Sequence, residues 1–285
     1  MIRTHTGFTF LPFPQARSHT ARIFTRQLQW LFGFWIYALA APLHAAPALT
    51  YEVIARYPHR TGAFTQGLEM AGATLYESSG LYGQSYVARW QPENDSAITC
   101  AEIPARYFAE GLTRFGDRLY VLTWQSGTGL ILNANTLQRE TTFRYSGEGW
   151  GLTHNHRELI MSDGSARLRF LDPVTLRQTS TLTVTLNGSP LQQLNELEWI
   201  DAGALAPQPR LLANIWQTDS IVVIDPASGR VTATLDLTAL NPPAQRMATE
   251  DVLNGIAYDR RDQTLLVTGK RWRYLWRIRL HSALP

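Results

Sequence analysis

A single lysine stands out among the residues that could carry chemistry. Lys270 is the only lysine in a chain that contains 25 arginines. An arginine side chain stays charged, whereas the lysine ammonium is a compact hydrogen-bond donor whose pKa changes readily with its surroundings. Position 270 therefore indicates a site that needs a small and tunable cation, unless this lysine has persisted by chance.

A carboxylate and three tryptophans occupy related positions of the chain. Glu110 and Trp150 each precede a Gly-Leu pair, while Trp124 and Trp216 each follow a strand-like apolar segment. A carboxylate enclosed by tryptophans should have a raised pKa, which suits general acid–base catalysis. Two structural alternatives stay open, because Glu110 could pair with a basic residue in a tight turn and the tryptophans could belong to the core.

A sequence repeat explains why these residues should meet. Beyond residue 50, a polar or aromatic residue, usually a Gly, and an aliphatic residue recur together about every 40–45 residues, with a longer last interval. The copies are 66–68, 110–112, 150–152, 195–197 (where Glu replaces Gly) and 254–256. A second apolar segment, a third that often ends in Asp-Pro, and a β-branched fourth follow. Four short strands with this period are typical of a propeller blade.

The two ends of the body complete a ring. The fifth repeat stops after its third strand at 275–280, and the body begins with a strand at 51–56 that belongs to no repeat. Pairing this strand into the last blade would cover an exposed sheet edge. The sequence therefore predicts an all-β protein, a five-bladed β-propeller closed by pairing of the N-terminal strand into the last blade.

The repeat also predicts which side chains converge, because the first strands of propeller blades line a central channel. Their equivalent ends should bring together Gln66, Glu110, Trp150, Asn195 or Glu196, and Asn254. The loops after the second strands should add Glu77, Trp124, Asp163, Trp216 and Lys270 at the same mouth. Aromatic walls with a few polar groups are typical of a small-molecule site.

Residues 1–47 have the layout of an export signal. Four arginines precede an apolar run over 28–41, and small residues follow at 45–48. This is typical of a secretory signal peptide, although an uncleaved membrane anchor is the alternative. We expect the domain at 48–285 to be periplasmic or secreted, or held at the inner membrane if the leader stays. Without the leader's arginines the body is nearly neutral, so we expect no nucleic-acid binding.

Several other chemistries lack their residues. Cys100 is the only cysteine, which excludes an intramolecular disulfide, and we interpret it as a small apolar residue within a strand. His154 and His156 fall in a turn that we place on the opposite face from the tryptophans, and no cluster has zinc-ligand spacing. No Gly-rich phosphate loop precedes a helix.

The same residues carry a resemblance to a known family. The segments 63–68, 76–85, 107–113, 122–124, 147–153, 161–164, 194–199, 214–219, 252–257 and 267–270 resemble, in this order, those of plant-type glutaminyl-peptide cyclotransferases, or glutamine cyclotransferases. Two departures are Ala109, where Gly is usual, and an insert at 204–207. The resemblance implies a five-bladed propeller and implicates Phe64, Gln66, Phe108, Glu110, Trp124, Trp150, Asn195, Trp216 and Lys270.

The activity implied by this resemblance is conversion of N-terminal glutamine in peptides or proteins to pyroglutamate, with release of ammonia. We expect Glu110 and Lys270 to be catalytic and the other seven residues to bind the substrate. We expect the reaction to require no metal or cofactor, although an ion could occupy the channel structurally. We also expect a monomer.

Two other functions stay open. A Ca²⁺-dependent lactonase would need carboxylates and an asparagine around the ion, which Glu77, Glu110, Asp163, Glu196 and Asn254 could supply. A non-catalytic binding module would use the same fold only as a recognition surface. Chelator sensitivity would separate the lactonase from the cyclotransferase, and turnover would exclude the binding module.

Overall fold

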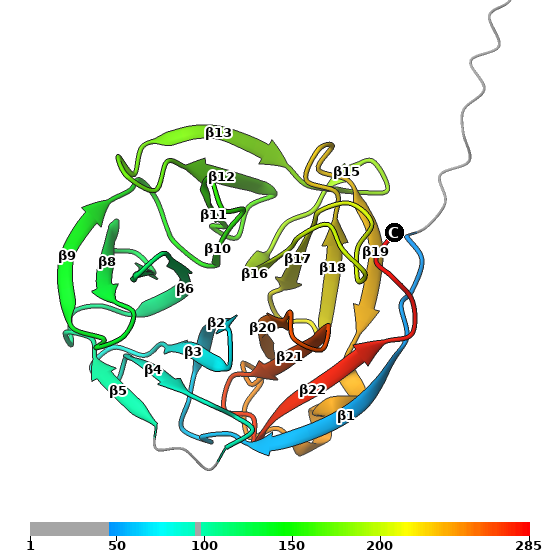
Figure 1. Ribbon diagram of the computed structural model, residues 1–285, viewed down its shortest axis with the longest axis horizontal. Helices are drawn as coiled ribbons and strands as arrows, with labels where there is room; N and C mark the ends of the chain where they lie inside the picture. The colour runs from blue at the N-terminus through cyan, green and yellow to red at the C-terminus, as the bar shows by residue number, and fades with distance from the viewer. Residues whose placement is uncertain (1–45, 95–97) are drawn as a thin grey trace, which may run out of the picture. The chain divides into compact units, whose positions relative to one another are not determined.

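The computed structural model describes residues 46–94 and 98–285, so almost all of the predicted leader lies outside the described residues. Five four-stranded antiparallel sheets stand around a central axis, each running outward from an inner strand (Figure 1). The inner strands of neighbouring sheets contact one another around the whole ring. This arrangement confirms the predicted all-β, five-bladed propeller.

The first four blades follow the chain from the inside of the ring outward. Blade 1 holds β2 (Thr65–Ala71), β3 (Thr74–Ser79), β4 (Tyr86–Trp90) and β5 (Thr99–Glu102). Blade 2 holds β6 (Ala109–Phe115), β7 (Arg118–Thr123), β8 (Thr128–Asn133) and β9 (Arg139–Arg144). Blade 3 holds β10 (Leu152–His154), β11 (Leu159–Met161), β12 (Arg167–Leu171) and β13 (Gln178–Thr183). Blade 4 holds β16 (Leu194–Ile200), β17 (Arg210–Ile215), β18 (Ser220–Ile224) and β19 (Val231–Asp236).

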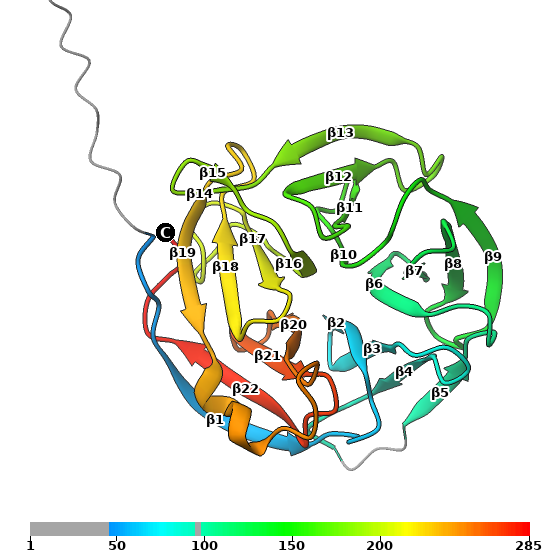
Figure 2. The same cartoon turned by 180° about the vertical axis from the view of Figure 1, so that it is seen from behind.

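The fifth blade combines strands from both ends of the body. It holds β20 (Leu253–Asp259), β21 (Thr264–Gly269), β22 (Tyr274–Leu280) and, outermost, β1 (Tyr51–Pro58). β1 pairs antiparallel with β22, from Tyr51 opposite Leu280 to Pro58 opposite Tyr274. Both views show blue β1 along the outer edge of red β22 (Figures 1 and 2).

Burial changes from the inside of each blade to the outside, and the residue types change with it. Every residue of β20 is buried, and six of the seven residues of β2 are buried. The outer strands β9 and β13 are mostly exposed and consist largely of Arg, Gln, Glu, Ser and Thr. Inner strands are therefore covered on both faces, and they combine apolar residues with buried polar ones such as Gln66, Glu196 and Asn254.

The glycine of the repeat is required by close contact between inner strands. A Cβ atom on Gly67 would lie 2.5 Å from Leu112 N, and one on Gly151 would lie 1.9 Å from Asn195 O. Blade 4 departs from this rule because Glu196 occupies the position. Its carboxylate instead accepts hydrogen bonds from Leu68 N at 3.2 Å and Ile256 N at 2.9 Å. Glu196 thus fills the middle of the channel.

Four details differ from, or add to, the expected blades. A short hairpin of β14 (Thr185–Leu186) and β15 (Ser189–Pro190) joins blades 3 and 4. The insertion before β20 contains the 3₁₀ turns η1 (Thr238–Leu240) and η2 (Pro243–Gln245), and neither could cross a membrane. The insert at 204–207 is partly core, since Leu205 and Ala206 are buried against blade 5. Cys100 does lie in β5, but it is exposed, so interpreting it as a small apolar residue was wrong.

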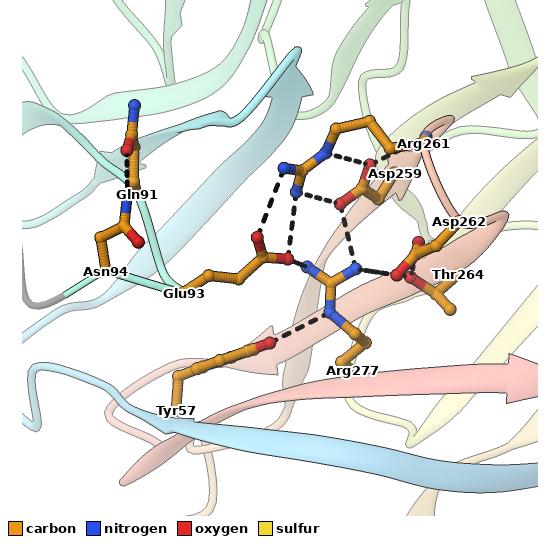
Figure 3. Close-up of polar contacts among 9 residues, drawn as sticks. All are labelled: Tyr57, Gln91, Glu93, Asn94, Asp259, Arg261, Asp262, Thr264 and Arg277. Carbon is orange, nitrogen blue, oxygen red and sulfur yellow. Dashed lines mark hydrogen bonds and ion pairs between the residues drawn. The ribbon is translucent and has the colours of Figure 1, made fainter.

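A buried arginine joins blade 5 to blade 1 and to β1. Arg277 donates to Asp259 at 3.0 Å, Asp262 at 2.7 Å and Thr264 at 2.9 Å (Figure 3). Its other nitrogens reach Glu93, between β4 and β5, at 2.6 Å and the Tyr57 hydroxyl of β1 at 3.2 Å. Arg277 and Asp259 are only 2% and 0% exposed. The guanidinium of Arg277 therefore connects β20, the turn after it, β1 and the segment between β4 and β5.

Arg277→Met should destabilise the protein by about 3 kcal/mol, because removing one partner of a buried ion network leaves carboxylates without their counter-charge. Arg261 also contacts Asp259 at 2.6 Å and can partly replace the lost charge. The loss of stability should therefore stay near the lower end of the roughly 3–5 kcal/mol typical of such changes. Arg279→Met is the matched control on the same strand. It breaks only an exposed pair with Glu52, which should contribute less than about 1 kcal/mol. Equal denaturant midpoints for the two variants would contradict the role assigned to Arg277.

Candidate active site

A cavity opens at the end of the channel where the inner strands begin. Its volume is about 230 Å³, below the roughly 300–1,000 Å³ typical of pockets for drug-sized ligands. Its lining contains all nine residues predicted from the sequence together with one more: Phe64, Gln66, Phe108, Glu110, Trp124, Trp150, Asn195, Trp216, Lys270 and Glu250. The cavity is therefore of a size to enclose a single amino-acid residue.

β-bulges turn the polar side chains into this cavity. The pairing register shifts at the repeat unit in four first strands, between Thr65 and Gly67, Ala109 and Leu112, Leu194 and Leu197, and Leu253 and Ile256. A bulge inserts an unpaired residue and re-aims its side chain. The residues within these bulges include Gln66, Glu110 and Asn195, which line the cavity, and Asn254, which does not line it but hydrogen-bonds Gln66. The repeat that builds the channel therefore also supplies its polar groups.

A repeated backbone hydrogen bond places the second set of side chains. The residue after the second strand donates its N–H to the residue just before the first strand of the same blade. The pairs are Trp124 with Phe108 at 3.0 Å, Trp216 with Gln193 at 2.9 Å, and Lys270 with Val252 at 3.0 Å. Gly80 holds this place in blade 1, where a Cβ atom would lie 2.2 Å from the Phe108 ring. Lys270 is thus the structural equivalent of two wall tryptophans.

Three amide and carboxylate side chains form a directed hydrogen-bond chain across neighbouring blades. Asn254 Nδ2 donates to the Thr65 carbonyl at 2.9 Å and to Gln66 Oε1 at 3.1 Å. Gln66 Nε2 then donates to Glu110 Oε1 at 3.0 Å. The carbonyl of Thr65 can only accept, so it fixes the orientation of both amides. The other carboxyl oxygen, Glu110 Oε2, can therefore interact with a ligand in the cavity.

The electrostatic environment of Glu110 favours its neutral form. Its side chain is 6% exposed, and burial is the main cause that raises its pKa well above 4.5. The positive charge of Lys270 opposes this rise in pKa, and the negative charge of Glu148 adds to it. A carboxyl whose pKa moves toward neutral pH can both accept and return a proton.

Lys270 is buried beside Glu110 but is not locked in an ion pair. Its Nζ lies 4.8 Å from the centre of the Phe64 ring, and burial lowers its pKa below 10.5. Within the described ranges, no hydrogen bond or ion pair joins this ammonium to another side chain. The donor is therefore available to an oxygen atom placed in the cavity.

Aromatic rings enclose the polar groups through edge contacts. Phe108 lies 6.1 Å from Phe64 and 5.7 Å from Trp124 between ring centres, and Trp150 lies 5.5 Å from Trp216. Interplanar angles of 85°, 64° and 76° give T-shaped pairs, a favoured geometry for aromatic rings. The rings thus form closely packed apolar walls.

Glu148 supports this wall and was not predicted from the sequence. Its Oε2 accepts hydrogen bonds from the indole nitrogens of Trp124 at 2.8 Å and Trp150 at 2.9 Å, while Oε1 accepts from Gln125 at 3.0 Å. Partial burial raises its pKa, but these three donors together outweigh burial and lower the pKa below 4.5, so Glu148 carries a negative charge. Its position between two glycines, two residues before Trp150, was the available signal. Glu250 was missed as well, because its loop has no equivalent in other blades.

Some residues that the repeat placed at the mouth do not line the cavity. Glu77 accepts from Thr65 at 2.6 Å and His59 at 2.9 Å, and Asp163 accepts from Ser165 at 2.6 Å. Glu196 lies deeper, in the channel. No group of three or more His, Cys, Asp or Glu side chains within 46–94 and 98–285 could hold a metal ion. The carboxylates that the lactonase alternative requires therefore do not converge.

The two histidines of blade 3 lie at the other end of the channel, as predicted. They border a separate cavity with Glu69 and Met70, which lie near the far end of β2 from Gln66. His156 contacts Asp201 at 2.9 Å, and burial lowers the pKa of His154 to about 4. Neither histidine lines the cavity that contains Glu110.

Comparisons with known proteins agree on one family. A family model described as glutamine cyclotransferase matches residues 29–280. A curated glutaminyl-peptide cyclotransferase from Arabidopsis thaliana is 38% identical over 236 residues, which cover 81% of this chain and 72% of that protein. The crystal structure of Myxococcus xanthus glutaminyl cyclase aligns with a TM-score of 0.73 and 35% identity, over 82% of this chain and 98% of that chain.

Proposed function

The chain belongs to the glutamine cyclotransferase family, and from this premise we propose that it converts N-terminal glutamine of peptides to pyroglutamate. The α-amine nitrogen forms a bond to the side-chain amide carbon, the bond from that carbon to the amide nitrogen breaks, and ammonia leaves. The observation that carries the proposal is a buried carboxyl, Glu110, beside a buried ammonium, Lys270, in a cavity the size of one residue.

Glu110 acts as the general base and then as the general acid. A free α-amine has a reference pKa of about 7.7–8.0, so most of it is protonated at neutral pH and cannot attack. Glu110 takes up a proton from the attacking amine and returns one to the departing nitrogen. The hydrogen bond from Gln66 holds one carboxyl oxygen and leaves the other directed at the substrate.

Lys270 and Asn195 stabilise the oxyanion that forms on the amide oxygen. Both line the cavity, and each carries a hydrogen-bond donor, the ammonium Nζ of Lys270 and the amide Nδ2 of Asn195. Donors held in place before the reaction, in a site that excludes water, stabilise developing charge more strongly than water does. The aromatic wall folds the glutamine side chain onto its own amine, and orientation of this kind can supply much of the rate because both reacting groups belong to one molecule.

Ammonia release from a blocked and an unblocked peptide tests this proposal. The purified protein should release ammonia from Gln-Ala, and the peptide product should lose the mass of one ammonia. Acetyl-Gln-Ala should be inert, because its nitrogen cannot attack. Since no step uses a metal or cofactor, we expect a chelator to leave the rate unchanged. Release from the acetylated peptide would show a hydrolytic deamidase instead, and no release from either would reject the proposal.

We further propose that the enzyme acts on exported peptides, as a monomer in the periplasm or outside the cell. The support is the basic and apolar leader in residues 1–47. N-terminal sequencing of protein recovered from the extracytoplasmic fraction should begin near residue 48, and light scattering should give one chain per particle. Recovery of the intact leader in the membrane fraction would favour the anchored alternative.

Glu148→Gln should move the acidic limb of the kcat–pH profile to lower pH. The negative charge of Glu148 raises the pKa of Glu110, so its removal lets Glu110 ionise at lower pH. Glutamine keeps an oxygen acceptor for the indole nitrogens of Trp124 and Trp150. Glu140→Gln, on the outside of blade 2, is the control and should leave the profile unchanged. An acidic limb that stays in place or moves upward in Glu148→Gln would contradict this electrostatic role.

A further inference from the structure

A second, larger cavity lies beside the active site on blade 5. Its volume is about 710 Å³, and its walls come from residues 239–251 before β20, residues 271–273 between β21 and β22, Arg56 on β1, and Thr61 between β1 and β2. Loops that precede a first strand and loops that follow a second strand lie at the end of the blade that carries the active site. The cavity therefore opens on the same face as the channel mouth.

One side chain, Arg271, contacts residues of both cavities. It lines the larger one, and its guanidinium carbon lies 5.1 Å from the centre of the Phe64 ring, which lines the active site. Arg271 also pairs with Asp251 at 2.6 Å and with Glu250 at 3.1 Å. Glu250 lines the active site and Asp251 the larger cavity. A chain that leaves the active site over Arg271 enters the second cavity.

The larger cavity holds two cations that lack acidic partners. Arg246 is neutralised by Asp219 at 2.5 Å, as Arg271 is by its two carboxylates. Across the part of the chain that the structure describes, neither Arg56 nor Arg273 forms an ion pair. Arg56 lies 4.7 Å above the Tyr274 ring.

The floor of this cavity is apolar and aromatic. Tyr274 and Trp276 both line it, and their rings form a T-shaped pair at 5.6 Å. The exposed guanidinium of Arg56, which stacks on this floor, and that of Arg273, which also lines the cavity, suit a carboxylate on an apolar stem. Arginine binds carboxylates well because its planar fork matches their geometry.

We propose that this cavity is a subsite for acidic side chains at the third and fourth residues of the substrate peptide. The inference rests on the proposed function and adds a substrate class to it. When the N-terminal glutamine fills the active site, an extended peptide advances by about 3.3–3.6 Å per residue. The second residue then crosses Arg271, and the next two lie over Arg56, Arg273 and the aromatic floor. Glutamate fits best, because its methylene groups can pack on Tyr274 and Trp276.

Three peptides with amidated C-termini test the subsite: Gln-Ala, Gln-Ala-Gln-Gln and Gln-Ala-Glu-Glu. At low ionic strength the acidic tetrapeptide should exceed its neutral counterpart in kcat/KM by about three- to tenfold, the range expected for two exposed ion pairs. The preference should shrink in about 0.5 M salt, which screens exposed charges. Arg56→Gln/Arg273→Gln should abolish the preference and leave turnover of Gln-Ala unchanged.

The control variant is Arg157→Gln/Arg230→Gln, which removes two exposed arginines that do not line this cavity. It should keep the acidic preference, which separates a local site from the overall charge. Equal rates of wild type on both tetrapeptides, or a preference that survives Arg56→Gln/Arg273→Gln, would overturn the subsite alone. Failure of wild type to release ammonia from Gln-Ala would instead overturn the proposed function, and the subsite with it.

Discussion

Glu110→Gln is expected to lower kcat for a glutaminyl dipeptide by about 10²–10⁴-fold, the usual contribution of a general acid–base group. Glutamine has nearly the same shape and keeps an oxygen acceptor for Gln66, so the cavity should be preserved. What it loses is the ability to take a proton from the amine and pass one to the departing nitrogen. KM should change little, because binding by the aromatic wall is retained. Initial rates of ammonia release measure both constants.

Stability measurements separate lost chemistry from lost folding in this variant. Because burial raises the pKa of Glu110 in the folded state, its contribution to stability is full below the unfolded pKa. That contribution is lost as pH rises through the folded pKa. Glu110→Gln should therefore be at least as stable as wild type at pH 8. Glu102→Gln, an exposed glutamate on β5, is the control and should retain full activity. A Glu110→Gln enzyme within about threefold of wild type would exclude Glu110 as the acid–base group.

Lys270→Met is expected to lower kcat by about 10²–10³-fold, the effect seen when one donor to an oxyanion is removed. Methionine keeps the length and the contact with Phe64 but cannot donate a hydrogen bond. Combining it with Glu110→Gln should give a loss smaller than the product of the two, because groups that act in one step are not additive. The measurement is the single-turnover rate of all three variants on the same dipeptide.

The substitution Lys270→Arg tests the same role through the pH dependence of kcat. The wild-type kcat should fall at alkaline pH as Lys270 loses its proton, and burial places this fall below pH 10.5 because it lowers the lysine pKa. Arginine stays protonated throughout this range. Activity that remains in Lys270→Arg should therefore show no alkaline limb. An unchanged alkaline limb would assign that titration to another group, and full activity of Lys270→Met would remove Lys270 from the mechanism.

The repeat predicted most of the polar residues that line the candidate active site, because the fold copies local geometry from blade to blade. Gln66, Glu110 and Asn195 occupy equivalent bulges, so their convergence follows from the spacing of one short unit. Glu77 was placed wrongly because counting along the second strand does not give the face on which a side chain lies. It points to His59 and Thr65 instead of to the cavity.

Contacts that have no equivalent in another blade could not be predicted in this way. Glu148 depends on the approach of two indole groups from blades 2 and 3, and Glu250 depends on the path of a single insertion. Arg277 and Glu93 are separated by 184 positions in the sequence, and no local pattern links them. The repeat therefore predicts the five blades and the polar residues at the centre of the site. The residues around them, such as Glu148 and Glu250, depend on irregular loops.

The pairing of β1 with β22 has a consequence for the order in which the chain can fold. Arg277 of β22 and Tyr57 of β1 lie 220 positions apart, so the seam between them is among the most non-local contacts of the protein. Non-local pairing is slow because a long loop must close before the contact is made. Until β1 docks, the outer edge of β22 presents unpaired backbone groups to any other strand nearby. We therefore expect refolding to end in a slow closing phase, with aggregation competing most strongly just before the ring is sealed.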